Sequence, residues 1–195
     1  MTGRFVIWRP GLQTDGICRI MRVEGVEDAF ELTEGTSRAE GWPAEAVCRM
    51  DPDYPKDIEL VDCLYGAGVL VIASRVRDVL ARAGARSVEL LPVRVINHKG
   101  RTASTDYVIA SPQDICDCID VDRSIVEWND IDPDSIVGCE SLVLKEDAVP
   151  PGHLIFRPEH WRKIVIIRRE LAAAMISAGL SGLHLMEPHD YNGLV

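Results

Sequence analysis

The sequence has few aromatic residues and no long apolar run. Phe, Trp and Tyr make up 6% of its 195 residues. Its longest apolar stretches, residues 66–74 and 164–167, fall short of the roughly 20 residues that cross a bilayer. The first apolar run, Phe5 to Trp8, is closed at once by Arg9 and Pro10, unlike a signal peptide. We therefore expect a cytoplasmic protein without a membrane span.

The sequence also lacks the motifs that commonly mark catalysis. It has no GxSxG, no GxxxxGK followed by Ser or Thr, and no GxGxxG, so nucleophile elbows, phosphate loops and dinucleotide sites are not indicated. Its 5 histidines form no HxxxH or HExxH pair and have no CxxC companion, which disfavours a zinc site. We expect no catalytic residue, no metal and no cofactor.

One acidic segment, Asp130-Ile131-Asp132-Pro133-Asp134, resembles the start of a calcium loop, with acids at its first, third and fifth positions. An EF-hand needs glycine at the sixth position and glutamate at the twelfth. Ser135 and Ser141 stand there instead, and proline occupies the fourth position. The segment is therefore better interpreted as a solvated acidic loop.

Cysteine is present but is not arranged for redox chemistry. Without a secretion signal, thiols are expected to stay reduced and to behave as small buried hydrophobic groups. Cys116 and Cys118 are too close together for a CxxC pair, and their acidic neighbours would raise a thiol pKa. The six cysteines are Cys18, Cys48, Cys63, Cys116, Cys118 and Cys139.

The chain has an excess of negative charge, which is unevenly distributed. The net charge is −10. Residues 14–63 hold 13 acidic and 5 basic residues, residues 113–147 hold 11 and 2, and the stretch between them holds 3 and 7. These two acidic bands argue against binding to nucleic-acid phosphates. They favour solvation or attraction to a basic protein surface, and the basic middle favours a solvated face or pairing with the bands.

The order of elements predicts an α+β fold with a largely antiparallel sheet and a few packed helices. The clearest helix runs from Ser74, placed as its N-cap, to Ala83, and Gly84 ends it. A second helix is expected to end at Gly179, and a short helical segment is expected within residues 44–50. Strands are expected over residues 5–8, 69–72, 87–96, 105–110, 115–121, 140–145, 154–156 and 182–186.

Residues 70–97, 105–124 and 141–185 resemble the bacterial immunity proteins of polymorphic toxin systems, in the eleventh immunity family. The resemblance covers residues 55–185, and its most specific pieces are ELLPV at 89–93, residues 119–124, LIFR at 154–157 and GLSGL at 179–183. It implies an immunity-family α+β core over residues 55–195, after an N-terminal region, residues 1–54, that could form a subdomain. It also implies neutralisation of a cognate toxin by binding.

We expect the second acidic band to contact that partner. Complementary charge speeds encounter and rejects wrong partners, whereas affinity comes from a few buried anchors. Trp128 stands among acidic residues and suits such an anchor, although a core tryptophan under a loop is an equal alternative. The expected partner-binding residues are Asp120, Asp122, Glu127, Trp128, Asp130, Asp132 and Asp134.

Two other functions stay open at this point. A small enzyme with dispersed catalytic carboxylates predicts a concave pocket that holds acids with strongly shifted pKa values. A regulatory or scaffold module is not separated from immunity by the sequence. The leading hypothesis is a cytoplasmic immunity protein that occludes a protein toxin with a basic surface and binds neither nucleic acid nor a membrane.

Overall fold

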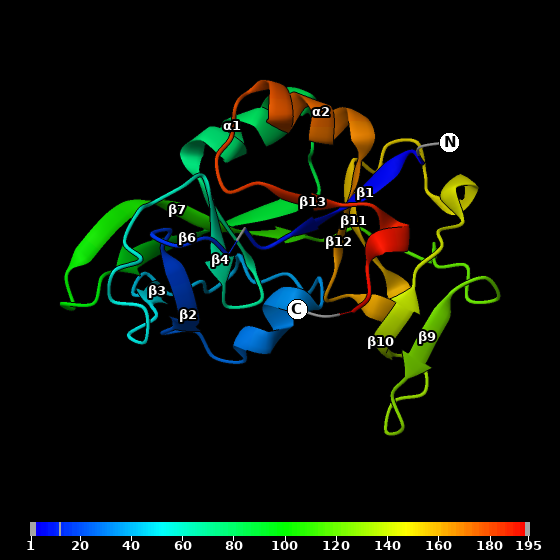
Figure 1. The fold of residues 1–195 in the computed structure, drawn as a ribbon, viewed down its shortest axis with the longest axis horizontal. Helices are drawn as coiled ribbons and strands as arrows, with labels where there is room; N and C mark the ends of the chain where they lie inside the picture. Colours follow the sequence, from blue (N-terminus) through cyan, green and yellow to red (C-terminus); the bar gives the residue numbers. More distant parts are fainter. Residues whose placement is uncertain (1–2, 12, 194–195) are drawn as a thin grey trace.

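The molecule combines a closed barrel, a five-stranded sheet and a two-stranded hairpin, with two helices above the first two (Figure 1). This computed structural model describes residues 3–11 and 13–193. The barrel consists, in pairing order, of β2 (Arg19–Glu24), β3 (Val47–Met50), β6 (Val88–Ile96), β7 (Thr102–Pro112), β5 (Leu70–Ala73) and β4 (Cys63–Gly66).

The second sheet contains β13 (His184–Met186), β1 (Phe5–Arg9), β12 (Val165–Arg168), β11 (Ile155–Pro158) and β8 (Ile115–Cys116), in this order. The hairpin is formed by β9 (Ile125–Trp128) and β10 (Ile136–Ser141). The helices are α1 (Ser74–Ala83), α2 (Arg169–Ser177) and four short 3-10 helices, η1 (Ala29–Thr33), η2 (Glu146–Ala148), η3 (Glu159–Trp161) and η4 (Pro188–Asp190). The α+β class is confirmed.

The barrel was not expected from the sequence, because its closure depends on pairs between distant segments. The long β6–β7 hairpin is antiparallel, as predicted, whereas β2 pairs with β4 and β3 pairs with β6 in parallel. Gly66 lies at the β2–β4 closure with φ of 110°, and a Cβ there would meet the carbonyl oxygen of Ile20 at 2.0 Å. Only glycine allows the two strands to approach this closely.

The prediction of a short helical segment within residues 44–50 is wrong. Residues 47–50 form β3, which is paired with β2 on one side and with β6 on the other. Strand pairing on both sides satisfies backbone groups that a short isolated helix would leave open, so tertiary context overrides a weak local preference. The strand expected over 115–121 is also shorter, with β8 limited to Ile115–Cys116.

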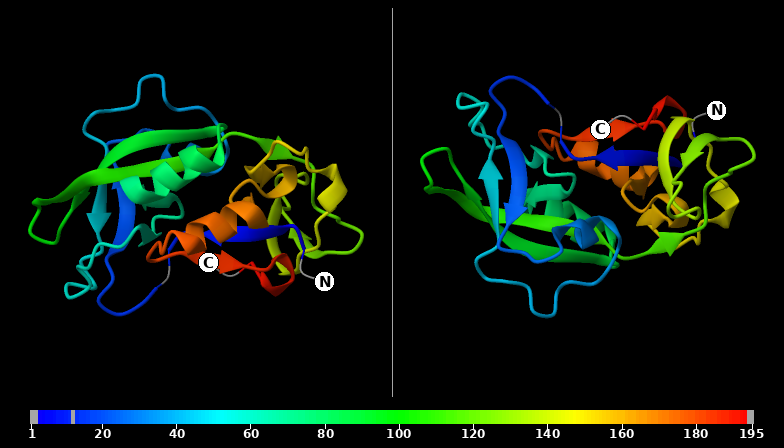
Figure 2. Two further views of the ribbon diagram at one scale, coloured as in Figure 1. Left: turned by 90° about the horizontal axis from the view of Figure 1, so that it is seen from above. Right: turned by 90° about the horizontal axis from the view of Figure 1, so that it is seen from below.

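The two α-helices lie side by side over the junction of barrel and sheet (Figure 2). Helix α1 spans Ser74–Ala83 and is followed by Gly84 in a left-handed conformation with φ of 79°, as predicted. Ser74 is not the N-cap, because Ala73 holds that position and Ser74 is the first helical residue. The Ser74 hydroxyl donates a hydrogen bond to Asp106 at 2.8 Å. Neither helix has the length and hydropathy of a membrane span, and no other helix of the described residues has them.

One apolar core joins the barrel, the sheet and both helices. It contains Trp8 from β1, Leu70 from β5, Leu80 from α1 and Met175 from α2, all at most 4% exposed. A second core fills the barrel, and a third lies between the five-stranded sheet and the β9–β10 hairpin. Because these cores share strands, barrel, sheet and hairpin are held in fixed positions relative to one another.

Backbone pairing links residues on both sides of the boundary predicted after residue 54. Strand β1 lies between β12 and β13 in the second sheet, and β2 and β3 complete the barrel with four later strands. The first 54 residues therefore contribute strands to both parts of the fold. The division at that point stays a prediction.

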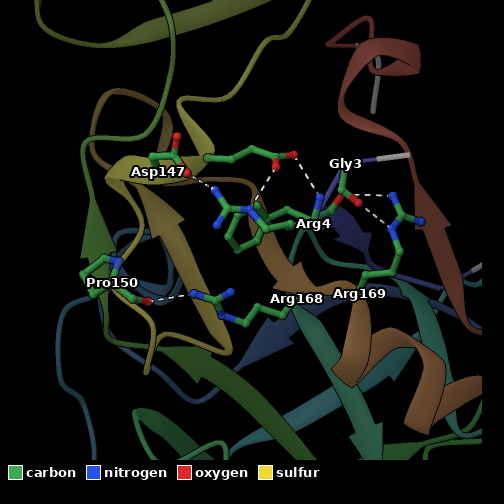
Figure 3. A network of polar contacts seen from close by, with 8 residues as sticks. Gly3, Arg4, Asp147, Pro150, Arg168 and Arg169 are labelled. Carbon is green, nitrogen blue, oxygen red and sulfur yellow. Dashed lines mark hydrogen bonds and ion pairs between the residues drawn. The ribbon is translucent and has the colours of Figure 1, made fainter. Parts of the chain in front are cut away.

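Polar contacts also fasten the start of the chain to later segments (Figure 3). Arg4 donates from Nε to Glu146 at 3.1 Å and from Nη2 to Asp147 at 2.6 Å, both in η2. Arg169, at the start of α2, donates from Nε to the carbonyl of Gly3 at 2.6 Å. Exposed ion pairs contribute little stability, but these contacts join the start of the chain to η2 and to α2.

All six cysteines are buried and free, as predicted. Burial raises the pKa of Cys18, Cys48 and Cys63 to about 12. Burial is also the largest cause of the raised pKa of Cys116, ahead of its acidic neighbours. The thiols are therefore core groups that lack the exposure and low pKa of reactive cysteines.

Candidate partner-binding surface

The β9–β10 hairpin extends away from the body of the protein, with the loop of residues 129–135 at its far end (Figure 1). Its inner face is anchored, because Val126, Ile136 and Cys139 pack into the third core. Its outer positions stay exposed, with Ile125 58% and Val137 49% accessible. One face of the hairpin thus fixes its position and the other is presented to solvent.

The loop at the tip is organised by its own hydrogen bonds. The Asn129 N–H donates to the carbonyl of Ser135 at 2.9 Å, and the Asn129 side-chain oxygen accepts from the N–H of Ile131 at 2.9 Å. The Ser135 N–H donates to the carbonyl of Asp132 at 2.9 Å. These local turns hold Ile131 outward, where it is 94% exposed.

Trp128 is the last residue of β9 and is held in place although it is 38% exposed. Its ring meets that of His160 edge to face, with centroids 5.6 Å apart. His160 is positioned in turn by a 2.9 Å hydrogen bond from its Nδ1 to the carbonyl of Asp134. A carbonyl can only accept, so Nδ1 carries the proton. The indole is therefore a fixed, accessible aromatic surface.

A cleft of about 750 Å³ adjoins this tip. Asp132, Asp134 and Val137 of the hairpin line one side of it. Phe30 of η1 and Glu34, which follows η1, line it as well, although they come from the first acidic band. Phe30 is 66% exposed, unusual for an aromatic side chain beside a cleft. The fold thus brings parts of both acidic bands to one surface.

The sequence profile of the Immunity protein family (Imm11) matches residues 21–190. The chain belongs to this immunity protein family. The match begins within β2, so it includes residues 21–54, which the resemblance described above left out. A search of curated proteins finds no match.

The immunity protein places the seven expected partner-binding residues in two locations. Glu127, Trp128, Asp130, Asp132 and Asp134 lie on or beside the hairpin tip, and all five are exposed. Asp120 and Asp122 lie before β9, at the opposite end of that strand. The length of β9 separates these two groups in space, although their residues follow one another closely in the sequence.

Ion pairing sets Asp120 apart from the other five acids, including its neighbour Asp122. Asp120 is 3.8 Å from Arg123, and its backbone carbonyl accepts bonds from the N–H groups of Arg123 and Ser124, so it builds a turn. Within residues 3–11 and 13–193, the five acids Asp122, Glu127, Asp130, Asp132 and Asp134 form no ion pair. These carboxylates keep their charge available to a partner.

Sequence reasoning missed several exposed apolar residues of this surface. Phe30 lies in a region without clear periodicity, and no local pattern predicts η1 there. Ile131 could have been found, because an isoleucine between aspartates in a loop has no core to enter. Val137 was missed because β10 begins earlier than the strand expected over 140–145.

Two glutamates of the immunity protein have a shifted pKa, and both shifts are downward. Hydrogen bonds from Arg49 and Arg22 lower the pKa of Glu24 to about 2, and a hydrogen bond from Arg169 lowers the pKa of Glu187. A general acid needs a raised carboxyl pKa instead. Among the residues described, no three His, Cys, Asp or Glu side chains converge as a metal site requires.

Proposed function

We propose that this immunity protein neutralises a cognate toxin, in the cytoplasm of the cell that makes both, by covering a basic toxin surface with its hairpin tip. The observation that carries the proposal is the fixed, accessible indole of Trp128 beside unpaired carboxylates. Family membership supports the immunity role. The tip supports occlusion, because a projecting hairpin can reach into a concave site.

Affinity in this proposal comes from apolar anchors. Trp128 and Ile131 expose apolar area on rigid backbone, so little conformational entropy is lost when a partner covers them. Phe30 and Val137 extend the apolar area across the adjoining cleft. Truncation of a central aromatic anchor typically costs about 2 kcal/mol or more, which is roughly a 30-fold loss of affinity.

Specificity and speed come from the acids around these anchors. Asp130, Asp132 and Asp134 face solvent without ion pairs, so a basic patch is attracted over a distance of about a Debye length, roughly 10 Å. The same charges repel nucleic acid and acidic proteins. This agrees with a partner whose active surface carries lysine and arginine.

The direct test is isothermal titration of the protein with its cognate toxin domain, which co-purification identifies first. A variant with Trp128, Asp130, Asp132 and Asp134 all changed to alanine should lose at least about 30-fold in affinity. It should also fail to protect cells that express the toxin. An affinity within twofold of that of the unmodified protein would overturn the assignment of the hairpin.

A matched control separates this surface from net charge. Glu40, Glu45 and Asp53 are exposed acids of the barrel side that form no ion pair among the described residues. Their triple alanine variant changes the net charge by the same three units as the aspartates of the hairpin. It should bind the toxin as the unmodified protein does. Equal losses in both variants would show that only the total charge matters.

A further inference from the structure

A second cleft, of about 410 Å³, lies at the junction of the barrel and the five-stranded sheet. Its walls are mainly apolar and include Ile7 of β1, Leu70 of β5 with the preceding Val69, and Val165 of β12. Clefts that bind small organic molecules have volumes of roughly 300–1,000 Å³ and similar apolar walls. The cleft is therefore large enough for such a molecule.

Three cationic side chains line this otherwise apolar cleft, in a chain whose net charge is −10. They are Arg9, Arg157 and Lys163. None of the three forms an ion pair with a carboxylate of residues 3–11 or 13–193. Arg9 lies over the ring of Tyr191, 5.5 Å from its centroid. The cleft thus gathers positive charge in an acidic protein.

Arg157 is the deepest of these cations and is only 3% exposed. Its N–H groups donate to three backbone carbonyls, those of Leu32 at 3.0 Å, Pro112 at 3.2 Å and Arg162 at 2.6 Å. Burial lowers its pKa to about 10, against a weaker opposing effect of Glu34. A guanidinium has five N–H donors, so these bonds leave two for another acceptor.

The other buried arginine of the described residues, Arg19, is neutralised by Asp57 at 2.8 Å. Among the described residues, the hydrogen-bond partners of Arg157 are neutral carbonyls, and it forms no ion pair. A buried charge without a counter-ion is unfavourable, and an anion in the adjoining cleft would remove that cost. The contrast points to a negatively charged ligand group.

Trp8 provides an independent observation on the same cleft. It lines the cleft, is 1% exposed, and its Nε1–H is buried without a hydrogen-bond partner among the described residues. Buried donors are nearly always paired in native proteins. An acceptor oxygen placed in the cleft would give this N–H a partner.

We propose that this cleft binds a small amphipathic carboxylate. The apolar body lies against Leu70 and Val165, and the carboxylate faces Arg157 and Lys163. Guanidinium groups match the planar geometry of a carboxylate. This cleft adjoins the one beside the hairpin tip, because Phe30 and Val137 line both. Octanoate binding is measured without the toxin, so either proposal can fail without the other.

The test uses octanoate as the probe, with octan-1-ol as its neutral counterpart, and follows the indole N–H signals of the protein by NMR. The Trp8 signal is assigned by its loss in Trp8→Phe. Octanoate should shift this signal saturably, and octan-1-ol should bind at least about tenfold more weakly because it lacks the charge. Octanoate that leaves the Trp8 signal unshifted, or octan-1-ol that binds equally well, would overturn the proposal.

Two double variants test whether the more exposed cations of the cleft contribute to octanoate binding, and both leave the buried Arg157 unchanged. The double variant Arg9→Ala, Lys163→Ala should weaken octanoate binding by roughly tenfold. Lys99→Ala, Arg101→Ala removes two exposed cations from the β6–β7 turn and should leave binding unchanged. Equal affinities of the two double variants would contradict a site at the junction cleft.

Discussion

Asp57 and Asp62 in the barrel and Asp130 and Asp132 on the hairpin are the same residue type in opposite settings. The first two are 8% and 6% exposed and accept hydrogen bonds from arginine at 2.8 Å. The hairpin aspartates are exposed and form no ion pair among the described residues. The negative charge therefore has two roles: in the barrel it stabilises the fold, and on the hairpin it faces solvent.

Removing Asp57 should have the largest effect on stability. Its carboxylate accepts from Arg19 Nε and from the Gly16 N–H, both at 2.8 Å. Asp57→Ala leaves the buried guanidinium without its partner, and such changes cost about 3 kcal/mol or more. Urea denaturation should show this loss as a lower midpoint with an unchanged slope.

The control for this experiment removes both charges. The double variant Arg19→Met, Asp57→Leu leaves no lone buried charge, so it should be more stable than Asp57→Ala alone. A double variant that is as unstable as the single one would show that packing at this position, and not charge pairing, holds the barrel together.

Asp62 should show the next largest effect. Its Oδ2 atom accepts from Arg75, from the Ser181 N–H and from the Ser181 hydroxyl, each at 2.8 Å. Asp62→Ala should cost about 2 kcal/mol, because it removes three hydrogen bonds to a buried carboxylate that hold the segment before β13 in place. Asp62→Asn keeps an acceptor oxygen and should cost less. Equal losses in urea denaturation would mean that the charge alone matters.

Unlike the barrel aspartates, the hairpin aspartates should affect binding and not stability. Changing Asp130, Asp132 and Asp134 to asparagine should alter the free energy of unfolding by no more than about 0.5 kcal/mol. Association with the toxin domain should slow by roughly tenfold at low salt and lose most of its salt dependence, as stopped-flow measurements can show. A stability loss above about 1 kcal/mol would assign these acids to the fold instead.

Local features of the fold were predictable from the sequence, and distant pairings were not. The limits of α1 follow from apolar spacing and from Gly84, which act within one helix. The β6–β7 hairpin follows from a turn between two apolar strands. Barrel closure requires β2 to meet β4 and β3 to meet β6, across long loops that carry no local signal.

The candidate surface likewise contains residues that the local sequence predicted and residues that only the fold brings there. The hairpin acids and Trp128 are adjacent in sequence, so composition alone drew attention to them. Phe30 and Glu34 reach the same cleft from about a hundred residues away, through a fold that the sequence did not reveal. The exposure of Trp128 shows that it is not a core residue, and its role as a partner anchor stays a prediction.

Glu24 shares features with both the barrel and the hairpin aspartates, and its replacement should have the smallest effect on stability. It is paired with Arg22 and Arg49, like the barrel aspartates, but it is solvent-accessible, like the hairpin acids. These arginines lower its pKa from 4.5 to about 2. A lowered carboxyl pKa stabilises the folded state above the unfolded pKa, and this contribution disappears as the pH falls from 4.5 towards 2.

The urea midpoints of the unmodified protein and of Glu24→Gln should therefore differ slightly at pH 6 and converge as the pH is lowered through about 4 to 2. Added salt should shrink the difference at pH 6, because water and ions screen an exposed pair. Asp130→Asn, which removes a carboxylate without an arginine partner, is the matched control. If the difference in urea midpoint stays constant over this pH range, the ion pairs of Glu24 with arginine add no stability. In that case only the buried aspartates would stabilise the barrel by charge pairing.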